Sequence, residues 1–173
     1  MKVREFYDFA RKNLPLADEK EIKNEANILL QFCLKFGFTE LFLQRERTLT
    51  EKELEFLENA IFLRKSGVPV QYILGSWEFM NMNLKVGEGV LIPREDTAVL
   101  VEEVIKNASS SKYLNLIDLC SGTGCVALAL EKNLEDFNEI CALEYSEKAF
   151  EYLSENIKNL GSKVKAVKGN VFE

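Results

Sequence analysis

In the C-terminal third of the chain, short apolar segments alternate with helical ones, and this alternation limits the fold more than any other feature. The apolar segments are 114–119, 140–143 and 164–167, and the stretches around 126–130 and 149–160 have helical periodicity. Short strands that alternate with helices pair in parallel through right-handed crossovers. We therefore predict an α/β fold with a parallel sheet. Because these strands make only part of a doubly wound sheet, we expect the chain to be a fragment of a longer polypeptide.

The first 67 residues have the pattern of a small helical bundle. Apolar residues recur at steps of three and four over 3–14 and again over 22–36, which places them on one face of each helix. Thr50 and Glu53 form a capping box for a further helix, which ends at Gly67. No residue of this region has an unusual chemical setting, so a purely structural cap and a docking surface for a partner both remain open.

Residues 68–90 predict a β-hairpin that links the helical region to the sheet. Apolar and polar residues alternate over 80–86, and Asn81 is a suitable turn residue because it tolerates a positive φ. An amphipathic helix is predicted after Pro93, with acidic residues near its N-terminus, where the helix dipole favours them. Ser109–Ser111 predict the loop that closes this segment.

The composition excludes several classes of site and partner. The chain has no His, which rules out Ser-His-Asp and Cys-His catalysis and a His-ligated metal, and we expect no metal site. The four Cys residues form no CxxC pair, which is typical of reduced thiols in the cytoplasm. The net charge of −6 argues against nonspecific binding of nucleic acid. No apolar run reaches the roughly 18 residues of a membrane span. We therefore expect a cytoplasmic protein that binds neither nucleic acid nor a membrane.

The stretch from Asp118 to Ala127 is the most informative chemically, because a strand runs into a glycine turn and then into a helix. Gly122 and Gly124 lack the side chains that would keep a ligand away from the backbone, and the helix N-terminus directs its amides to the same place. Glu144 follows about twenty residues later, at the end of the next strand, where a carboxylate can accept hydrogen bonds from both ribose hydroxyls. The spacing predicts a nucleotide site.

Two ligand classes fit this loop. Gly122, Gly124 and Ala127 satisfy the GxGxxA variant of the dinucleotide motif. S-adenosylmethionine also fits, and a carboxylate at Asp118 would repel a diphosphate but attract the ammonium and sulfonium groups of this methyl donor. We therefore favour S-adenosylmethionine. In the competing structural interpretation, Asp118 caps the loop and the glycines only make a tight turn.

Two further segments resemble those of a known family. One is Gly67-x-Pro69-x-Gln71-Tyr72-Ile73-x-Gly75-x-x-Glu78-Phe79, and the other is Leu91-Ile92-Pro93-Arg94-x-x-Thr97 followed by Leu100-Val101-Glu102. Together with the Asp118–Gly124 loop, they make the whole chain similar to the release-factor N5-glutamine methyltransferases, the PrmC or HemK family. The loop is shared with many methyltransferases, whereas the other two segments are specific to this family.

The resemblance implies three parts. A helical bundle over 1–67 would help to dock the release factor, a β-hairpin linker would occupy 68–90, and 91–173 would form the first half of a doubly wound, Rossmann-like class I methyltransferase sheet. The implied cofactor is S-adenosyl-L-methionine, with S-adenosyl-L-homocysteine as its product. The implied function is methylation of the side-chain amide of the glutamine in the GGQ motif of peptide-chain release factors.

Site residues are carried over from the family by position. The methionine part of the cofactor would lie along Cys120, Ser121, Gly122, Thr123 and Gly124; Glu144 would take the ribose hydroxyls; and Asn170 with Val171 would lie beside the adenine. Arg94 and Thr97 would border the same pocket. Phe79 is a candidate wall where cofactor and glutamine meet, with packing in the hairpin core as the alternative.

The chain departs from the family pattern in three places. The family usually has Asp where Glu144 and Asn170 stand, and neither change forbids binding. No residue matches the Asn-Pro-Pro-Tyr motif that holds the substrate amide, so we expect the chain alone to be inactive. A methyltransferase of another protein or small molecule, and a non-enzymatic binding module, stay as alternatives. We also expect self-association through an open sheet edge at 114–119.

Overall fold

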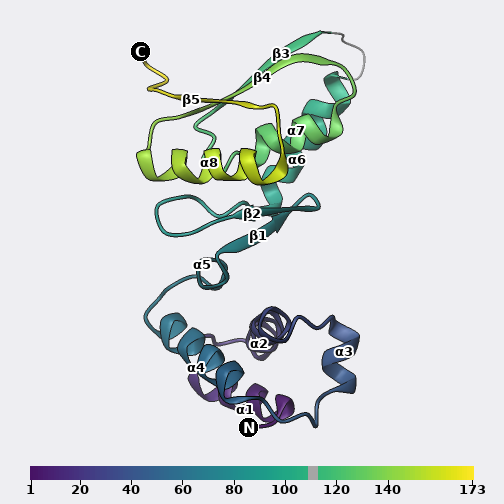
Figure 1. Ribbon diagram of the computed structural model, residues 1–173, viewed down its shortest axis with the longest axis vertical. Coiled ribbons are helices and arrows are strands. Elements are labelled where there is room, and N and C mark those ends of the chain that lie inside the picture. The colour runs from purple at the N-terminus through teal and green to yellow at the C-terminus, as the bar shows by residue number, and fades with distance from the viewer. Residues whose placement is uncertain (109–112) are drawn as a thin grey trace. The chain divides into compact units, whose positions relative to one another are not determined.

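The computed structural model describes residues 1–108 and 113–173, and it divides the chain into two compact units, Met1–Leu74 and Gly75–Glu173 (Figure 1). The loop predicted at Ser109–Ser111 lies outside the described residues. The three-part organisation with boundaries after residues 67 and 90 stays a prediction. Each unit has a hydrophobic core of its own.

The first unit is helical throughout. Its helices are α1 (Val3–Asn13), α2 (Glu19–Leu34), α3 (Phe38–Leu43), α4 (Glu51–Lys65) and α5 (Val70–Leu74). The predicted capping box begins α4: Glu53 N donates to Thr50 Oγ1 at 3.3 Å, and Thr50 N donates to Glu53 Oε2 at 2.8 Å. Residues 70–74 fall within the range 68–90 for which the sequence predicts a β-hairpin, but they form α5. Five residues are too few for periodicity to distinguish a helix from a strand.

Large apolar side chains from three helices fill the core of the first unit. Fully buried members are Phe6 from α1, Leu29 and Leu30 from α2, and Leu57 from α4. One ion pair also lies largely inside: the guanidinium of Arg64 contacts the carboxylate of Glu25 and donates from Nη1 to Val68 O at 2.8 Å. Because its charge is paired and its N–H groups are bonded, Arg64 is accommodated at the core boundary.

The second unit begins with the predicted β-hairpin. Strand β1 (Ser76–Phe79) pairs antiparallel with β2 (Met82–Lys85), so that Phe79 faces Met82 across the turn. Met80 and Asn81 form the turn with φ values of 46° and 58°. Positive φ at both central residues is the geometry that matches the twist of a hairpin. The prediction of Asn81 as a turn residue is confirmed, and Met80 shares its conformation.

The remaining elements form the predicted parallel sheet and its helices. They are α6 (Glu95–Ala108), β3 (Leu114–Leu119), α7 (Cys125–Asn133), β4 (Phe137–Glu144), α8 (Glu147–Leu160) and β5 (Lys165–Lys168). The strand order is β3-β4-β5, and both pairings are parallel. The α/β fold class is confirmed. Strand β4 starts earlier than predicted because Phe137 and Asn138 continue the extended backbone before the apolar run begins.

The two faces of this sheet differ in cover. Helices α7 and α8 lie on the same side (Figure 1), where Ile140 and Ala142 are buried with Leu128 and Leu153. On the other face Ile117 is 61% exposed and Leu119 is 50% exposed. Among the described residues β3 pairs only with β4, so β3 is an edge strand there. In the described part of the sheet, the apolar face opposite α7 and α8 and the edge formed by β3 are therefore accessible.

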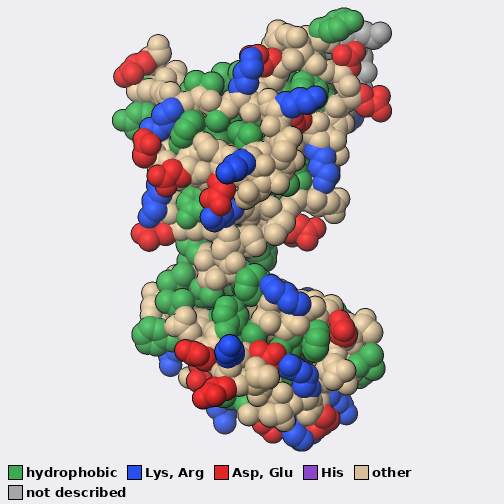
Figure 2. Space-filling model, in the orientation of Figure 1, with side chains coloured by type: hydrophobic (Ala, Val, Ile, Leu, Met, Phe, Trp, Pro, Cys, Tyr) green, Lys and Arg blue, Asp and Glu red, His purple; other side chains and the backbone are tan. Residues whose placement is uncertain are grey.

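The charged side chains are dispersed rather than gathered by sign. Figure 2 shows Lys and Arg interspersed with Asp and Glu on the face that it draws. Several of them form ion pairs, such as Lys85 with Glu155 at 2.5 Å and Lys168 with Glu147 at 2.8 Å. In the part of the chain that the structure describes, no helix is long and apolar enough to cross a membrane.

Candidate functional site

The glycine turn between β3 and α7 depends on left-handed backbone at three alternate positions. Cys120, Gly122 and Gly124 have φ values of 61°, 55° and 80°. Glycine adopts this conformation without the steric penalty that a Cβ atom brings, whereas Cys120 bears the penalty. Gly124 is also the N-cap residue of α7. The glycines are therefore required by the path of the chain from strand to helix.

The two glycines serve different purposes. A Cβ atom built on Gly122 would meet only Val90 Cγ2, at 3.8 Å, so the backbone there is open to a ligand. A Cβ atom on Gly124 would lie 2.5 Å from Leu153 Cδ1, so that space already holds a core side chain. The sequence prediction gave both glycines the same role toward a ligand. The structure assigns that openness to Gly122 and packing to Gly124.

The glycine loop is joined to the end of β4 by the carboxylate of Glu144. Its Oε2 accepts from Gly122 N at 2.8 Å, and its Oε1 accepts from Ser146 N at 2.7 Å. Glu144 is only 8% exposed, and burial of a carboxylate is tolerated when backbone N–H groups are bonded to it. The loop and the strand-end acid, about twenty residues apart in sequence, are thus in contact, and the predicted binding of ribose hydroxyls by Glu144 stays a prediction.

Ser121 and Thr123 hold the loop in place rather than face outward. Ser121 N donates to Leu143 O at 3.0 Å, and Ser121 Oγ donates to Asp118 O at 2.8 Å. Gly124 N donates to Ser121 O at 2.7 Å and closes the turn. Thr123 is 2% exposed. The side chain of Cys120, in contrast, is exposed.

Asp118 caps the helix that follows the loop. Its Oδ2 accepts from Ala127 N, in the first turn of α7, at 3.2 Å. Burial raises the pKa of the Asp118 carboxyl above its ordinary value of 3.8, and repulsion from Glu144 raises it further, against the lowering effect of the bonds to Ala127 and Ser121. The competing interpretation had Asp118 cap the loop, whereas the structure shows its side chain bonded to the first turn of α7. An electrostatic role toward a cationic ligand stays a prediction.

Asn170 and Val171 follow β5 on the side of the sheet edge where Glu144 lies. The register pairs Glu144 with Lys168, and Gly169 N donates to Glu144 O at 3.1 Å. Asn170 Oδ1 accepts from Phe172 N at 3.1 Å, which fixes a turn there. The carboxyl ends of parallel strands are where α/β folds bind ligands, and β3, β4 and β5 end here together.

Arg94 and Thr97 lie at the start of α6. Thr97 N donates to Arg94 O at 3.0 Å. The Arg94 side chain is exposed, and within residues 1–108 and 113–173 it forms no ion pair. The structure gives neither residue a hydrogen bond to the glycine loop among the parts it describes, so their place beside a cofactor stays a prediction.

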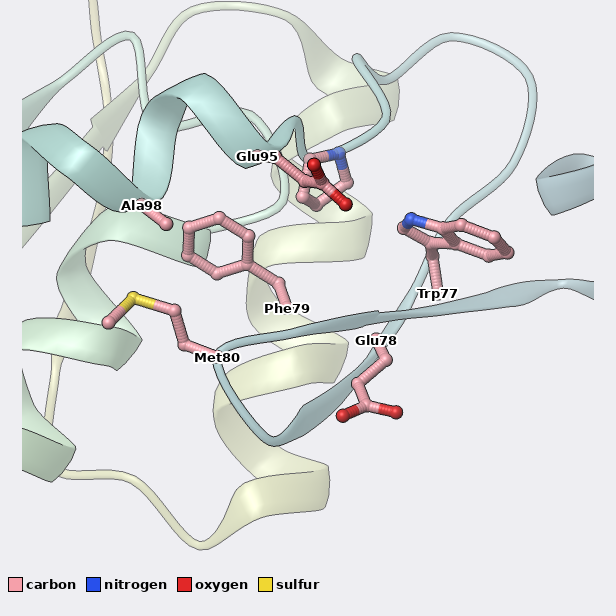
Figure 3. Close-up of a pocket in the computed structure, with 7 residues that line it drawn as sticks. Trp77, Glu78, Phe79, Met80, Glu95 and Ala98 are labelled. Carbon is pink, nitrogen blue, oxygen red and sulfur yellow. The ribbon is translucent and has the colours of Figure 1, made fainter.

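Phe79 packs in the core as the alternative interpretation expected, and its place at a wall between cofactor and glutamine stays a prediction. It is 5% exposed, belongs to the core of the second unit, and lines a cavity of about 460 Å³ between the hairpin and the start of α6. Figure 3 shows the rings of Phe79 and Trp77 on the same side of β1, with the Glu95 carboxylate near them and Glu78 on the other side. The residues that line this cavity include none of the glycine loop.

Sequence reasoning missed one polar residue beside the site, Asn156 of α8. It is buried, and its side chain bonds to Thr123 in the glycine loop. The signal was present: Ala149, Leu153 and Asn156 follow one another at helical steps of four and three, so an amide interrupts an apolar stripe. No cluster of three or more metal-ligating side chains occurs in the described ranges.

Comparisons with known proteins connect this geometry to a family. Residues 5–75 match the family model described as the PrmC N-terminal domain. A protein of Thermodesulfovibrio yellowstonii named release factor glutamine methyltransferase is 37% identical over 76% of this chain and 47% of its own length. A protein of the same name from Clostridium acetobutylicum is 31% identical over 100% of this chain and 61% of its own length.

The matches cover a larger share of this chain than of its relatives. The chain spans about half the length of the curated relatives that it matches, while they match most of it. Among solved structures, Trm5b from Pyrococcus abyssi superimposes with a TM-score of 0.46 and 22% identity, over 54% of this chain and 27% of that one. The sequence matches, rather than this partial structural likeness, make the connection.

Proposed function

The chain is related in sequence to the release factor glutamine methyltransferases, and from this premise we propose that it binds S-adenosylmethionine at the glycine loop. We propose further that it belongs to an enzyme that methylates the GGQ glutamine of peptide-chain release factors. The observation that carries the cofactor proposal is the contact between Glu144 and Gly122. It brings an open stretch of backbone and a strand-end carboxylate together at the carboxyl edge of the sheet.

Glu144 has capacity left for a ribose. A carboxylate has about four lone-pair sites, and the two backbone N–H groups of Gly122 and Ser146 occupy one on each oxygen. The remaining sites suit the two ribose hydroxyls. Asn170, which follows the strand paired with β4, would then lie beside the adenine, as we predict from the family.

The charges of the site support a cationic ligand. S-adenosylmethionine, when bound, supplies a methyl group on a positively charged sulfur. The acidic groups Asp118 and Glu144 lie at the strand ends beside the loop, and no His, Lys or Arg belongs to residues 118–124. A dinucleotide would place two phosphates where this local charge is negative, which disfavours it.

The amide nitrogen of glutamine is a weak nucleophile because its lone pair is delocalised into the carbonyl group. An enzyme must therefore hold and orient it, which contributes through proximity and electrostatics. Phe79, with Trp77 in the same cavity, offers an apolar wall for the glutamine side chain. The sequence has no Asn-Pro-Pro-Tyr segment to accept the amide hydrogens, and we infer that residues 1–173 alone do not complete the transfer.

The helical unit is proposed to dock the release factor. Its α3 exposes Phe38, Phe42 and Leu43, each at least 66% accessible. Exposed apolar groups that lie together on one element are typical of a surface for a protein partner. The proposal also places the chain in the cytoplasm, where translation terminates.

Calorimetric titration of residues 1–173 with S-adenosylmethionine, and separately with NAD, tests the cofactor. We expect saturable binding of S-adenosylmethionine and of S-adenosylhomocysteine, and no competition by NAD. Binding of NAD with exclusion of the sulfonium compound would overturn the proposal. The variant Gly122→Val places a side chain on the open backbone and should abolish binding. Its matched control is Gly161→Val, because Gly161 also has a positive φ, of 63°, and has no heavy atom within 4 Å.

Incubation with a release factor and methyl-labelled donor tests the reaction. The Clostridium acetobutylicum relative serves as the active reference on the same release factor. We expect label on the GGQ glutamine from the reference and none from residues 1–173. Label on that glutamine from residues 1–173 would refute the inactivity but support the substrate, and label only on another protein would refute the substrate.

A further inference from the structure

Asn156 is a buried amide in the second unit, at a point where three elements meet. It lies on the core side of α8 and is only 1% exposed. A carboxamide buried without partners would cost several kcal/mol in an apolar environment, so its hydrogen bonds determine why it is accommodated. Both ends of its side chain are bonded.

The bonds of Asn156 join the hairpin to the glycine loop. Asn156 Oδ1 accepts from Lys85 N at 2.7 Å, and Nδ2 donates to Lys85 O at 3.1 Å. Nδ2 also donates to Thr123 O at 3.0 Å. Lys85 is the last residue of β2, and Thr123 lies between the two loop glycines. A single side chain therefore bonds to both the segment that carries Phe79 and the segment that carries Gly122.

The chemistry requires an amide at this position. A carboxamide offers one acceptor atom and two N–H donors, and here it meets one N–H group and two carbonyl oxygens. An Asp side chain of the same shape would keep the bond from Lys85 N but would place an oxygen against two carbonyls. A Leu side chain would keep the volume and lose every bond, leaving buried backbone groups unsatisfied.

Other residues of α8 hold the same two segments without bonding to both. A Cβ atom on Gly87 would lie 2.1 Å from Tyr152 Oη, so the chain after β2 runs directly against the helix. Leu153 fills the space beside Gly124. These contacts fix the segments against α8 through packing, and Asn156 adds a directional bond to a loop carbonyl.

We propose that Asn156 is a positioning residue. By bonding to Thr123 O, it fixes the orientation of the Thr123 peptide group, and so the position of the open backbone at Gly122, relative to the hairpin. This inference rests on the proposed function for its meaning in catalysis, because that backbone lies in the proposed cofactor site. The effect on the loop does not depend on the proposed function, because a loop that loses the bond to Thr123 O opens more often whether or not a ligand binds.

The test compares Asn156→Asp with wild type, and Asn159→Asp on the exposed side of the same helix serves as the matched control. Amide hydrogen exchange without ligand is the first measurement. We expect Asn156→Asp to speed exchange at Gly122 and Gly124 by about tenfold or more, as loss of a buried hydrogen bond implies, with little change at Ala129 in α7. Unchanged loop exchange in a folded Asn156→Asp variant would overturn the inference.

Cofactor binding is the second measurement. The dissociation constant of S-adenosylmethionine should rise by about tenfold or more in Asn156→Asp and stay unchanged in Asn159→Asp. If wild type binds no S-adenosylmethionine, the proposed function fails while the exchange result still decides the role of Asn156. If wild type binds and Asn156→Asp binds equally well, the inference fails while the proposed function stands.

A third measurement needs no variant and covers the case in which Asn156→Asp does not fold. In wild type, saturation with S-adenosylmethionine should slow exchange of the Lys85 amide, which is bonded to Asn156, together with that of Gly122. Slowing at Gly122 with no change at Lys85 would show that the loop is not coupled to the hairpin and would overturn the inference. If no ligand binds, equal opening rates at the Lys85 and Gly124 amides support it, and unequal rates contradict it.

Discussion

The carboxylate of Glu144 accepts a hydrogen bond from the backbone N–H of Gly122 at 2.8 Å. This bond links the end of one strand to the turn that follows its neighbour. It also brings a negative charge to Gly122, the loop glycine at which a side chain would meet only Val90 Cγ2, at 3.8 Å. The proposed cofactor site is built around this pair.

Replacing Glu144 with Gln is expected to weaken S-adenosylmethionine binding strongly. The substitution keeps the size of the side chain but turns one acceptor oxygen into a donor, opposite either Gly122 N or Ser146 N. Loss of a bond to a charged group typically costs about 1.5–3 kcal/mol, or roughly 10- to 150-fold in dissociation constant. Calorimetry measures this effect. Glu151→Gln, on the exposed side of α8, should bind like wild type, and equal binding by both variants would contradict the role of Glu144.

Replacing Asp118 with Asn is expected to alter how stability depends on pH. The folded state raises the pKa of the Asp118 carboxyl, so its contribution to stability is present below pH 3.8 and is lost as the pH rises through the raised value. Asn does not titrate. The free energy of unfolding of Asp118→Asn should therefore improve relative to wild type as the pH rises from 3.8 through the raised pKa, as urea titrations at a series of pH values would show. A difference independent of pH would contradict the raised pKa.

Replacing Gly124 with Ala is expected to destabilise the second unit. The new Cβ atom would lie 2.5 Å from Leu153 Cδ1, and the residue would have to keep a φ of 80°. Left-handed backbone costs about 1–2 kcal/mol, and overpacking in a core adds about 1–3 kcal/mol. Gly161→Ala is the control, because Gly161 has a φ of 63° and nothing within 4 Å. Urea unfolding should show a clearly larger loss for Gly124→Ala, and equal losses would argue against the contact with Leu153.

The chain is expected to self-associate through β3 and the open face of the sheet. Ile117 and Leu119 are half exposed or more there, and β3 has one unpaired edge within the described residues. Light scattering over a concentration series up to high micromolar measures the mass. Ile117→Lys should reduce association, whereas Phe42→Lys, at an equally exposed apolar residue of the helical unit, should not. A monodisperse wild-type monomer throughout would rule out the expectation.

Periodicity predicted most of the architecture. Residues 114–119 were expected as a strand and form β3, and the helix expected after Thr50 begins there with its capping box. These elements are long enough, or carry a strong enough local signal, to be read without tertiary information. The short helix α5 was missed because five residues give no period. The outer bounds of β4 were missed because Phe137 and Asn138 extend the strand beyond its apolar run.

The residue types of the proposed site could be predicted from the sequence, but the role of each residue could not. The spacing of Gly122 and Glu144 predicted one nucleotide site, and the structure places the two residues in direct contact. The role of Gly124 depends on where Leu153 packs, which comes from a helix more than twenty residues further along the chain. Asn156 could not be assigned partners from sequence, because Lys85 and Thr123 bond to it through backbone atoms that any residue supplies.

The backbone amides of Ser121, Gly122 and Gly124 donate to Leu143 O, Glu144 Oε2 and Ser121 O, so each already has a hydrogen-bond partner within the protein. The turn therefore takes its shape when the protein folds, and a ligand that binds there does not have to order the loop. Rigid recognition of this kind lowers the entropic cost of association. A substitution at a residue that bonds to these amides can therefore change ligand affinity even where that residue does not contact the ligand.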